Sequence, residues 1–380
     1  MRTRLMNCLV GAFALVAFVA CRPKAPEQEL KSWAIGPFER PDGVNPIIVP
    51  QETTFYCPLT GDTIPWENGD TFNPAAIVKN DTICVLYRAE DQSGQGIGQR
   101  TSRIGLARTV DGITIANQAT APVLFPDNDS QQELEWPGGC EDPRVAVTED
   151  GTYVILYTQW NRKQARLAVA LSKDLINWEK YGPAFRNAFN GKFADSFSKS
   201  ASMVTTLKNG RLVISKVNGN YLMYWGEKHV YAATSADLIN WEPLVDENQE
   251  LIPLASPRKG YFDSELTECG PPAVMTDMGI VLIYNGKNKA GADGDTTYTG
   301  NAYCAGQLLF GKNDPYQVID RLDKPFLVPQ ESFEKSGQYP AGTVFVEGLV
   351  FHQNKWFLYY GCADSRVAVA VSNKNVQFSN

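Results

Sequence analysis

Short apolar runs that alternate with polar residues recur along most of the chain. Paired runs are separated by turns rich in Asn, Asp and Gly, which is typical of β-hairpins. The pattern predicts five hairpins, at residues 75–87, 144–157, 212–224, 273–284 and 349–359. No helical period competes over any long window, so the sequence predicts an all-β protein.

An internal repeat accompanies these hairpins. Equally spaced copies begin at Ala107, Ala170 and Ala233, and the last two continue with the same six residues, Asp-Leu-Ile-Asn-Trp-Glu. Fainter copies lie at 309–313 and 370–374. Five units, each of three or four strands, predict a five-bladed β-propeller.

The repeats also predict the role of two tryptophans. We expect Trp178 and Trp241, which occupy the same place in two copies, to pack within their sheets and not to bind a ligand. The propeller is predicted to span residues 41–380.

The N-terminus has the pattern of an export signal. Arg2 and Arg4 precede an apolar run that is too short to span a bilayer, and this run ends in small residues. Residues 1–20 are therefore predicted to be a signal peptide. Cys21 follows as in a bacterial lipobox, so we expect it to be lipidated. Residues 21–40 are predicted to be a tether, and the protein a periplasmic or cell-surface lipoprotein whose only membrane contact is its lipid.

Composition narrows the chemistry further. The net charge is −7 and basic runs are absent, which argues against a nucleic-acid partner. The only histidines are His229 and His352, and no cysteine pair has the spacing of a zinc site. We therefore expect no metal and no cofactor.

The propeller topology predicts one face that carries the chemistry. The first strand of each blade starts at this face and the second strand returns to it, with Arg211 at the start of the third blade's first strand. The residues expected there are Asp91, Asp142, Glu227, Glu265, Glu268, Glu347 and Asp364, with Arg88, Arg144 and Trp160.

So many carboxylates in one funnel suggest glycoside chemistry. One carboxylic acid would protonate the leaving oxygen while a second carboxylate activates water or attacks. Calcium binding is the competing use of such oxygens. The sequence has no Asp-x-Asp-x-Asp-Gly loop, however, and the arginines would oppose a cation.

The sequence resembles glycoside hydrolase family 130, the β-mannoside phosphorylases and mannosidases, from Phe72 to Ser372. The resemblance rests on an ordered set of motifs: 72–75, 86–89, 141–144, 270–272 with 282–284, 314–315 with 321–325, and 360–364. It implies a five-bladed propeller, an inverting mechanism and a mannose in the −1 subsite. It also implies that Asp142 is the general acid, acting through a sugar hydroxyl, and that Asn73, Arg88, Arg144 and Asp364 hold sugar.

Departures from the phosphorylase pattern favour hydrolysis. Phosphorylase members carry a lysine and a histidine that help to hold phosphate. This chain has Glu265 at the lysine position, Glu268 close by, and Asn285 in place of the histidine. Carboxylates repel a phosphate dianion and are suited to orienting water.

The sequence therefore predicts an inverting, exo-acting β-mannosidase that acts on a mannose-containing oligosaccharide, with β-1,2 links favoured. Asp142 is the predicted acid, and Glu268 with Glu227 is predicted to hold the nucleophilic water. Asp91, Lys199, Tyr284 and Asn285 complete the predicted substrate-binding set, although the segment with Lys199 could equally be a plain loop.

Two alternatives stay open. One is a β-mannoside phosphorylase that releases mannose 1-phosphate, and the other is a glycan-binding lipoprotein without catalysis. The presence of Asp142 together with Glu227 and Glu268 argues against the second. The sequence does not determine the oligomeric state.

Overall fold

The computed structural model of the protein describes residues 30–373. The predicted signal peptide and Cys21 lie outside these residues. The described part is built from β-strands, and its helical turns are only three or four residues long: α1 (Gln132–Glu135), η1 (Ala188–Gly191) and η2 (Ser332–Glu334). The all-β prediction is confirmed. Within 30–373, no helix has the length and apolar character needed to cross a membrane.

After the hairpin of β1 (Thr54–Cys57) and β2 (Asp62–Pro65), the strands form five successive antiparallel groups. The first contains β3 (Asp70–Lys79), β4 (Thr82–Glu90), β5 (Ser102–Thr109) and β6 (Asn117–Gln118). The second contains β7 (Gly139–Val147), β8 (Tyr153–Trp160), β9 (Ala165–Ser172) and β10 (Glu179–Pro183). The third contains β11 (Ala201–Lys208), β12 (Arg211–Ile214), β13 (Lys216–Val217), β14 (Asn220–Trp225), β15 (Tyr231–Ser235) and β16 (Glu242–Pro243). The fourth contains β17 (Leu266–Cys269), β18 (Ala273–Thr276), β19 (Gly279–Lys287), β20 (Tyr303–Phe310) and β21 (Val318–Arg321). The fifth contains β22 (Val344–His352), β23 (Lys355–Cys362) and β24 (Arg366–Ser372).

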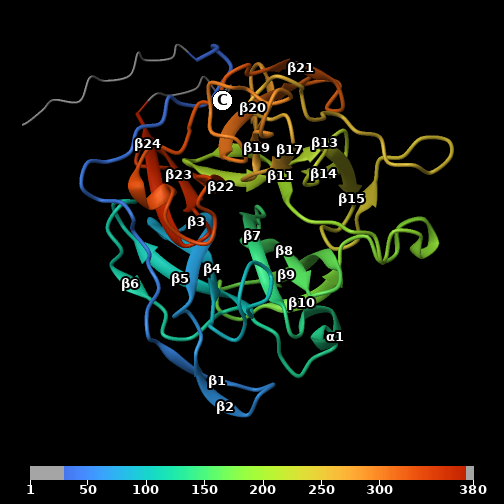
Figure 1. The fold of residues 1–380 in the computed structure, drawn as a ribbon. Coiled ribbons are helices and arrows are strands. Elements are labelled where there is room, and N and C mark those ends of the chain that lie inside the picture. Colours follow the sequence, from blue (N-terminus) through green and yellow to red (C-terminus); the bar gives the residue numbers. More distant parts are fainter. Residues whose placement is uncertain (1–29, 374–380) are drawn as a thin grey trace, which may run out of the picture.

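The first strands of these groups lie next to one another. Strand β3 contacts β7, β7 contacts β11, β11 pairs in parallel with β18, and β22 contacts both β19 and β3. In Figure 1 the groups accordingly follow one another around the molecule, from blue through green and orange to red, and the red group returns beside the blue one.

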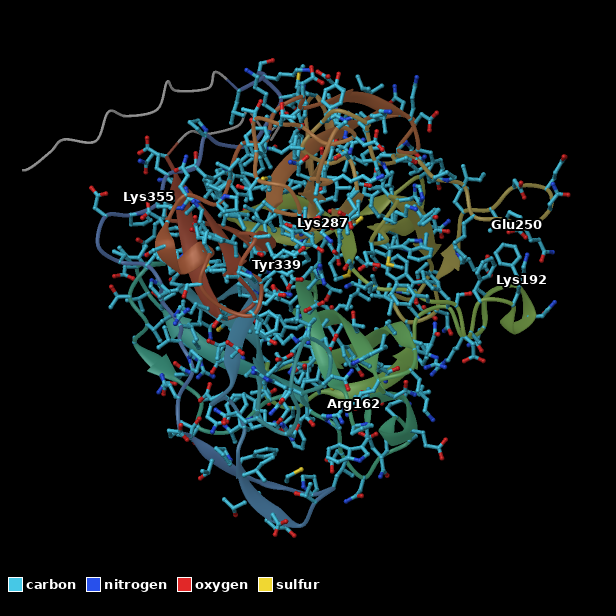
Figure 2. The ribbon with its side chains drawn as sticks, viewed as in Figure 1. Arg162, Lys192, Glu250, Lys287, Tyr339 and Lys355 are labelled. Atoms are coloured by element: carbon cyan, nitrogen blue, oxygen red, sulfur yellow. The ribbon has the colours of Figure 1, made fainter. Side chains whose placement is uncertain are left out.

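Apolar clusters fill the spaces between neighbouring groups. One cluster, for example, joins Leu156 of the second group to Met223 and Trp225 of the third. The six cysteines among residues 30–373 are all buried and free of disulfides. At the edge of the molecule, two loops project together and are joined by an ion pair of 3.3 Å between Lys192 and Glu250 (Figure 2).

The third group corrects one sequence prediction. Its first strand is β11, which pairs with both β12 and β14, and not the predicted strand that starts at Leu212. Strand β11 did not show in the pattern because Ser202 and Thr205 interrupt its apolar residues. Both are fully buried and donate to backbone carbonyls of the fourth group. The residues that lead into this group are therefore Lys199 and Ser200, and Arg211 is exposed at a hairpin turn.

The folded unit begins before residue 41. Glu39 and Ile48 form antiparallel bridges with β24, so the N-terminal segment extends the fifth group. Trp33 and Ile35 are buried, and the Trp33 indole donates to Asp320 over 2.8 Å. The part of the predicted tether that the structure describes is thus packed against the sheets, because it carries these apolar side chains.

A buried tyrosine in the second half of the second long strand forms a hydrogen bond with a buried carboxylate in four of the five groups. The pairs are Tyr87–Glu67 (2.7 Å), Tyr157–Glu135 (2.8 Å), Tyr284–Asp263 (2.6 Å) and Tyr360–Glu334 (2.8 Å). In the third group, Tyr224 donates to the carbonyl of Pro315 instead. Each carboxylate lies in the segment that leads into the first strand of its group, so each pair fixes that segment to the sheet.

We predict that Tyr157→Phe lowers the free energy of unfolding by about 1.5–3 kcal/mol, the usual value of a hydrogen bond to a charged group. The change removes only the hydroxyl that donates to buried Glu135. Urea unfolding of both proteins measures the difference. Tyr56→Phe, at a tyrosine that is 65% exposed, is the control and should leave stability unchanged. An equal loss in both variants would contradict a structural role for the pair.

Candidate active site

The regular pairing of the first strand is interrupted at an equivalent position in three of the five groups, and these positions form one level of the molecule. The pairing register shifts between Phe72 and Pro74 in β3, between Glu141 and Arg144 in β7, and between Val346 and Gly348 in β22. Such bulges redirect side chains out of the regular alternation. The shifts leave Asn73, Asp142 and Glu347 unpaired at equivalent places of three groups.

Asn73 and Asp142 are the two residues of this level that precede a proline. Their φ angles are 45° and 48°. Positive φ is uncommon outside glycine, and Asn and Asp tolerate it best. Strained backbone of this kind is frequent at functional sites.

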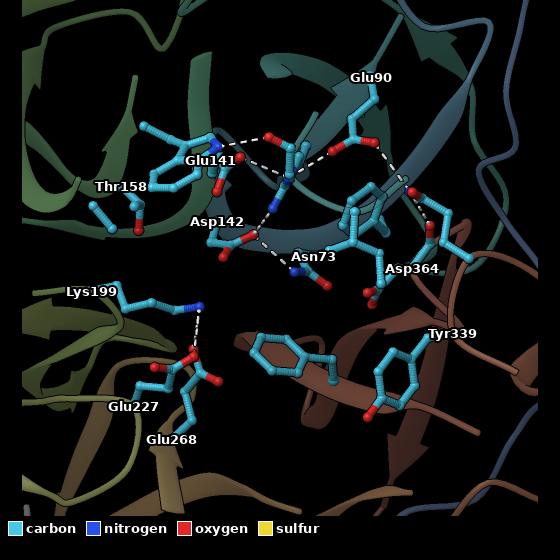
Figure 3. Close-up of a pocket in the computed structure, with 18 of the residues that line it drawn as sticks. Asn73, Glu90, Glu141, Asp142, Thr158, Lys199, Glu227, Glu268, Tyr339 and Asp364 are labelled. Carbon is cyan, nitrogen blue, oxygen red and sulfur yellow. Dashed lines mark hydrogen bonds and ion pairs between the residues drawn. The ribbon is translucent and has the colours of Figure 1, made fainter. Parts of the chain in front are cut away.

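A cavity of about 370 Å³ opens above this level (Figure 3). Seven of the predicted site residues line it together: Asn73, Arg88, Asp142, Lys199, Glu227, Glu268 and Asp364. They come from all five strand groups or from the segments that lead into them. The tertiary structure thus gathers residues that are almost 300 positions apart in the sequence.

Arg88 is the centre of one side of the cavity. Its guanidinium donates to Asp142 over 3.1 Å, to Glu90 over 2.6 Å and to Glu141 over 2.8 Å. Asn73 donates to the same Asp142 oxygen, Oδ1, over 2.8 Å. Asp142 is therefore fixed through one oxygen, while its Oδ2 receives no hydrogen bond from residues 30–373 and is left for a ligand.

The carboxyls around Arg88 differ in proton affinity. Burial raises the pKa of Asp142, but the charges of Arg88, Lys199 and Arg144 outweigh it and hold this pKa well below the usual range. Burial raises the pKa of Glu141 to about 7 against the charge of Arg88. Burial raises the pKa of Asp364 to about 7 as well. Near neutral pH, Glu141 and Asp364 are therefore partly protonated while Asp142 is ionised.

Lys199 is the centre of the other side. Its ammonium lies 3.3 Å from Glu227 and 3.4 Å from Glu268. Glu268 is 1% exposed and accepts a hydrogen bond from Ser200, whereas the Glu227 side chain is 35% exposed. Burial raises the pKa of Glu268, Lys199 lowers it, and Glu227 raises it further. The two carboxylates thus share one cation at the cavity wall.

Two predicted substrate-binding residues lie behind the cavity wall in other roles. Asp91 pairs with Arg103 over 2.8 Å and caps backbone N–H groups of its own loop. Tyr284 is fully buried and forms the tyrosine–carboxylate pair with Asp263. Asp91 directly follows β4, whereas Tyr284 lies within β19, three residues before its end. Both side chains are engaged by partners outside the cavity, Arg103 and Asp263.

Arg144 and Asn285 also do not line the cavity. Arg144 is 1% exposed and lies beneath it, where it donates to the carbonyls of Asp142 and Cys269 and pairs with Glu347 over 2.8 Å. The Asn285 amide makes two hydrogen bonds with the backbone of Val346 and so joins β19 to β22. Both residues hold the strands that carry the site.

The structure adds residues that were not predicted as site residues. Glu90 and Thr158 line the cavity, and so does Gln338, which donates to Glu90. Glu90 could have been found, because it lies two residues after Arg88 on the same face of β4. Gln338 lies on an irregular loop after η2, and no sequence period marks it.

An aromatic wall closes one side of the cavity. It consists of Tyr303, Tyr339 and Phe345, with the Tyr303 ring 5.4 Å from that of Tyr339 and 5.6 Å from that of Phe345. Lys287 lies behind it, 5.9 Å from the Tyr339 ring centre, and pairs with Glu265 over 3.0 Å (Figure 2). Glu265 therefore faces Lys287 outside the cavity. Flat aromatic faces beside carboxylates suit a polyhydroxylated ligand.

Metal ligands are not grouped in the part of the chain that the structure describes. Among residues 30–373, no group of three or more His, Cys, Asp or Glu side chains is arranged to hold a metal ion. The arrangement of the cavity instead suits acid and base chemistry, with one carboxylate fixed by Arg88 and two others across the cavity at Lys199.

Comparisons with known proteins point to one family. The model of glycoside hydrolase family 130, described as beta-1,4-mannooligosaccharide phosphorylase, matches residues 54–377. A 1,2-beta-oligomannan phosphorylase of Thermoanaerobacter sp. (strain X514) is 32% identical over 319 residues, which cover 82% of this chain and 93% of that protein.

Solved structures are more similar still. A glycosyl hydrolase from Bacteroides ovatus is 62% identical, with a TM-score of 0.89, and the match covers 91% of this chain and 96% of that one. A structure from work on family 130 glycoside hydrolases that target beta-1,2 mannosidic linkages in Candida mannan is 57% identical, with a TM-score of 0.90. That match covers 93% of this chain and 99% of the other.

We predict that Asp364→Asn stabilises the protein at neutral and higher pH. The folded-state pKa of about 7 lies above the ordinary value of 3.8, so the stability associated with this carboxyl is lost as pH rises through this interval. At about 1.4 kcal/mol per pKa unit, the variant should gain up to about 4 kcal/mol over the parent at about pH 8 and less than about 1 kcal/mol at about pH 4. Urea unfolding at the two pH values measures this. Asp277→Asn, at an exposed aspartate, should show no such difference; a pH-independent effect at Asp364 would contradict the prediction.

Proposed function

The chain belongs to glycoside hydrolase family 130, and we propose that it is a hydrolase of that family: an inverting, exo-acting β-mannosidase that cleaves β-1,2-linked manno-oligosaccharides. We also propose that its five strand groups are the blades of a β-propeller, which the ring of contacts among their first strands supports. A cavity of about 370 Å³ suits the end of a glycan chain better than its middle, which supports exo action.

The observation that carries the hydrolase proposal is the pairing of Lys199. A phosphorylase needs cations that are free to hold a phosphate dianion. The Lys199 ammonium is already shared by Glu227 and Glu268, and Arg88 is engaged by three carboxylates. A phosphate next to Lys199 would face two carboxylates at short range, where repulsion costs several kcal/mol in a poorly solvated site.

The same arrangement suits water. In an inverting reaction, water attacks C1 of the mannose from the face opposite to the leaving oxygen. One carboxylate of the Glu227 and Glu268 pair accepts a proton from the water while the new C1–O bond forms and the glycosidic C1–O bond breaks. The leaving oxygen receives its proton from the side of Asp142. One proton is taken up and one is released, so the reaction balances without a further reactant.

Asp142 needs a proton before it can act as an acid. The cations around it keep it ionised, but Glu141 and Asp364 beside it have pKa values of about 7. Because Glu141 and Asp364 are partly protonated near neutral pH, a proton is available close to Asp142. We propose that substrate binding transfers it to Asp142, which then acts through a sugar hydroxyl.

Relatives support the substrate class. Both the 1,2-beta-oligomannan phosphorylase and the hydrolases that target beta-1,2 mannosidic linkages act on β-1,2-mannosides. The structure from the work on these hydrolases is 57% identical to this chain, whereas the phosphorylase is 32% identical, and this difference supports hydrolysis. The aromatic wall of Tyr303, Tyr339 and Phe345 offers stacking surface for such sugars.

The place of the enzyme in the cell is a separate proposal. The signal-peptide pattern of residues 1–20 and the cysteine at 21 support an exported lipoprotein, periplasmic or on the cell surface. Radiolabelled palmitate should be incorporated into the full-length chain and not into Cys21→Ala.

We predict that the protein releases free mannose from β-1,2-mannobiose at the same rate with and without phosphate, because water is the nucleophile. Product analysis by anion-exchange chromatography measures mannose and mannose 1-phosphate, and NMR at early times should show α-mannose first. A phosphate requirement with mannose 1-phosphate as product would establish a phosphorylase. Binding without any turnover would establish a glycan-binding protein.

We predict that Glu268→Gln and Glu227→Gln each lower kcat, with at least one of them doing so by about 100-fold or more, the usual range for loss of a general base. Each change keeps the shape of the side chain and removes its charge. Glu265→Gln is the matched control, since Glu265 pairs with Lys287 outside the cavity. Near-parent rates for both Glu227 and Glu268 variants would place the base elsewhere.

A further inference from the structure

The repeated hexapeptide builds the same turn twice. Asp174 accepts hydrogen bonds from the N–H groups of Ile176 and Asn177, and the Asn177 amide donates back to Asp174. The turn at Asp237 has the same three bonds. The next residues, Leu175 and Leu238, have φ angles of 70° and 69°. Local sequence therefore determines the backbone of both turns.

The tryptophans of the two turns have different surroundings. Trp241 is 1% exposed, its indole N–H donates to the Leu238 carbonyl over 3.0 Å, and it packs in one cluster with Phe185 and Ala188. Trp178 is only half-buried, and its indole N–H has no acceptor among residues 30–373. Such an orphaned N–H is unfavourable. The internal packing that we expected is present for both tryptophans, since Trp178 packs against the apolar cluster between the first and second groups. Only Trp178 keeps part of its surface exposed and its indole N–H without an acceptor among residues 30–373.

Trp178 lines an open groove of about 660 Å³. Tyr181 and Leu171 add to its apolar surface, and Lys173, Glu179 and Thr152 supply polar groups. The groove therefore combines two aromatic side chains with hydrogen-bonding groups that include both an ammonium and a carboxylate.

The groove and the catalytic cavity lie at opposite ends of one strand. Ala165, at the start of β9, lines the cavity, whereas Ser172, at its end, lines the groove. A strand of this length separates the two by roughly 23 Å. A ligand in the groove would thus lie away from the reacting bond.

We propose that the groove at Trp178 is a second glycan-binding site, which holds a neutral oligosaccharide segment away from the catalytic cavity. A sugar ring would stack on Trp178 and Tyr181, and its hydroxyls would bond to Glu179 and Lys173. Flat aromatic surface with mixed polar groups matches the two faces of a sugar ring.

The charges of the groove argue against an anionic occupant, and the proposed function favours a neutral glycan. An anionic ligand would meet Glu179 and Asp174 in the groove, on a chain whose net charge is −7. Lys173 already pairs with Asp150 over 3.2 Å and donates to Thr152 over 2.6 Å, so it does not offset this repulsion. A neutral polyol avoids the repulsion, and a neutral glycan is the substrate class of the proposed function. The site would keep a long or surface-bound glycan near the enzyme while chain ends are cleaved.

The test is gel retardation by soluble Candida mannan in an Asp142→Asn background, which prevents cleavage during the run. Trp178→Ala and Tyr181→Ala should each weaken binding about 3- to 10-fold, as expected for loss of one stacking partner. Ile176→Ala is the matched control, because Ile176 is 48% exposed on the same turn but does not line the groove. Circular dichroism verifies folding, and Tyr181→Ala keeps the test valid if the Trp178 variant does not fold.

In the active enzyme, Tyr181→Ala should leave turnover of β-1,2-mannobiose unchanged and lower the rate on mannan. A parent protein that mannan does not retard would overturn the proposal. Equal retardation of parent, Trp178→Ala and Tyr181→Ala would also overturn it, as would an equal loss in Ile176→Ala. Retardation measures binding in a variant that does not cleave the glycan. A failure here is therefore distinct from a failure of the hydrolase proposal, which is tested by the products formed from mannobiose with and without phosphate.

Discussion

A buried tyrosine hydroxyl donates to a buried carboxylate in four of the five strand groups, and the chemistry of the cavity depends on these contacts. Each carboxylate lies four to seven residues before a side chain of the cavity: Glu67 before Asn73, Glu135 before Asp142, Asp263 before Glu268, and Glu334 before Gln338. Each carboxylate has further partners, such as Lys180 for Glu135 and Arg40 for Glu334, and the tyrosine adds a bond from the sheet. The pair therefore helps to fix the irregular segment that brings each of these side chains to the cavity.

The cavity concentrates charge at a cost to stability. Arg88 and Lys199 are the cations of its lining, and they face Glu90, Glu141, Asp142, Glu227, Glu268 and Asp364. Burial would favour neutral carboxyls, so the cations decide which of them stay ionised. Asp142 is held ionised by its neighbours, while Glu141 and Asp364 have raised pKa values. Separation of proton affinities among neighbouring carboxyls is how one site supports both acid and base roles.

The two copies of Asp-Leu-Ile-Asn-Trp-Glu show that local sequence determines the conformation of a turn but not what packs on it. Their turns have the same hydrogen bonds and the same positive φ at leucine. Yet Trp241 is covered by the segment with Phe185 and Ala188, and Trp178 faces an open groove. The difference lies in what the rest of the chain packs on each turn, and a repeat in sequence does not imply a repeat in function.

The sequence alone determined the all-β class, most of the hairpins and several residues that line the cavity, because alternation and turn chemistry act over a few residues. Asn73, Asp142, Glu227 and Glu268 could be predicted in this way together with the family resemblance. Only the tertiary structure decided that Lys199 bridges two carboxylates, that Tyr284 and Asn285 hold strands together, and that Gln338 and Tyr339 reach the cavity. The physical reason is that alternation along a strand shows on which face of the sheet a side chain lies. It does not show which distant residue forms a hydrogen bond or ion pair with that side chain. That partner is set by packing between groups.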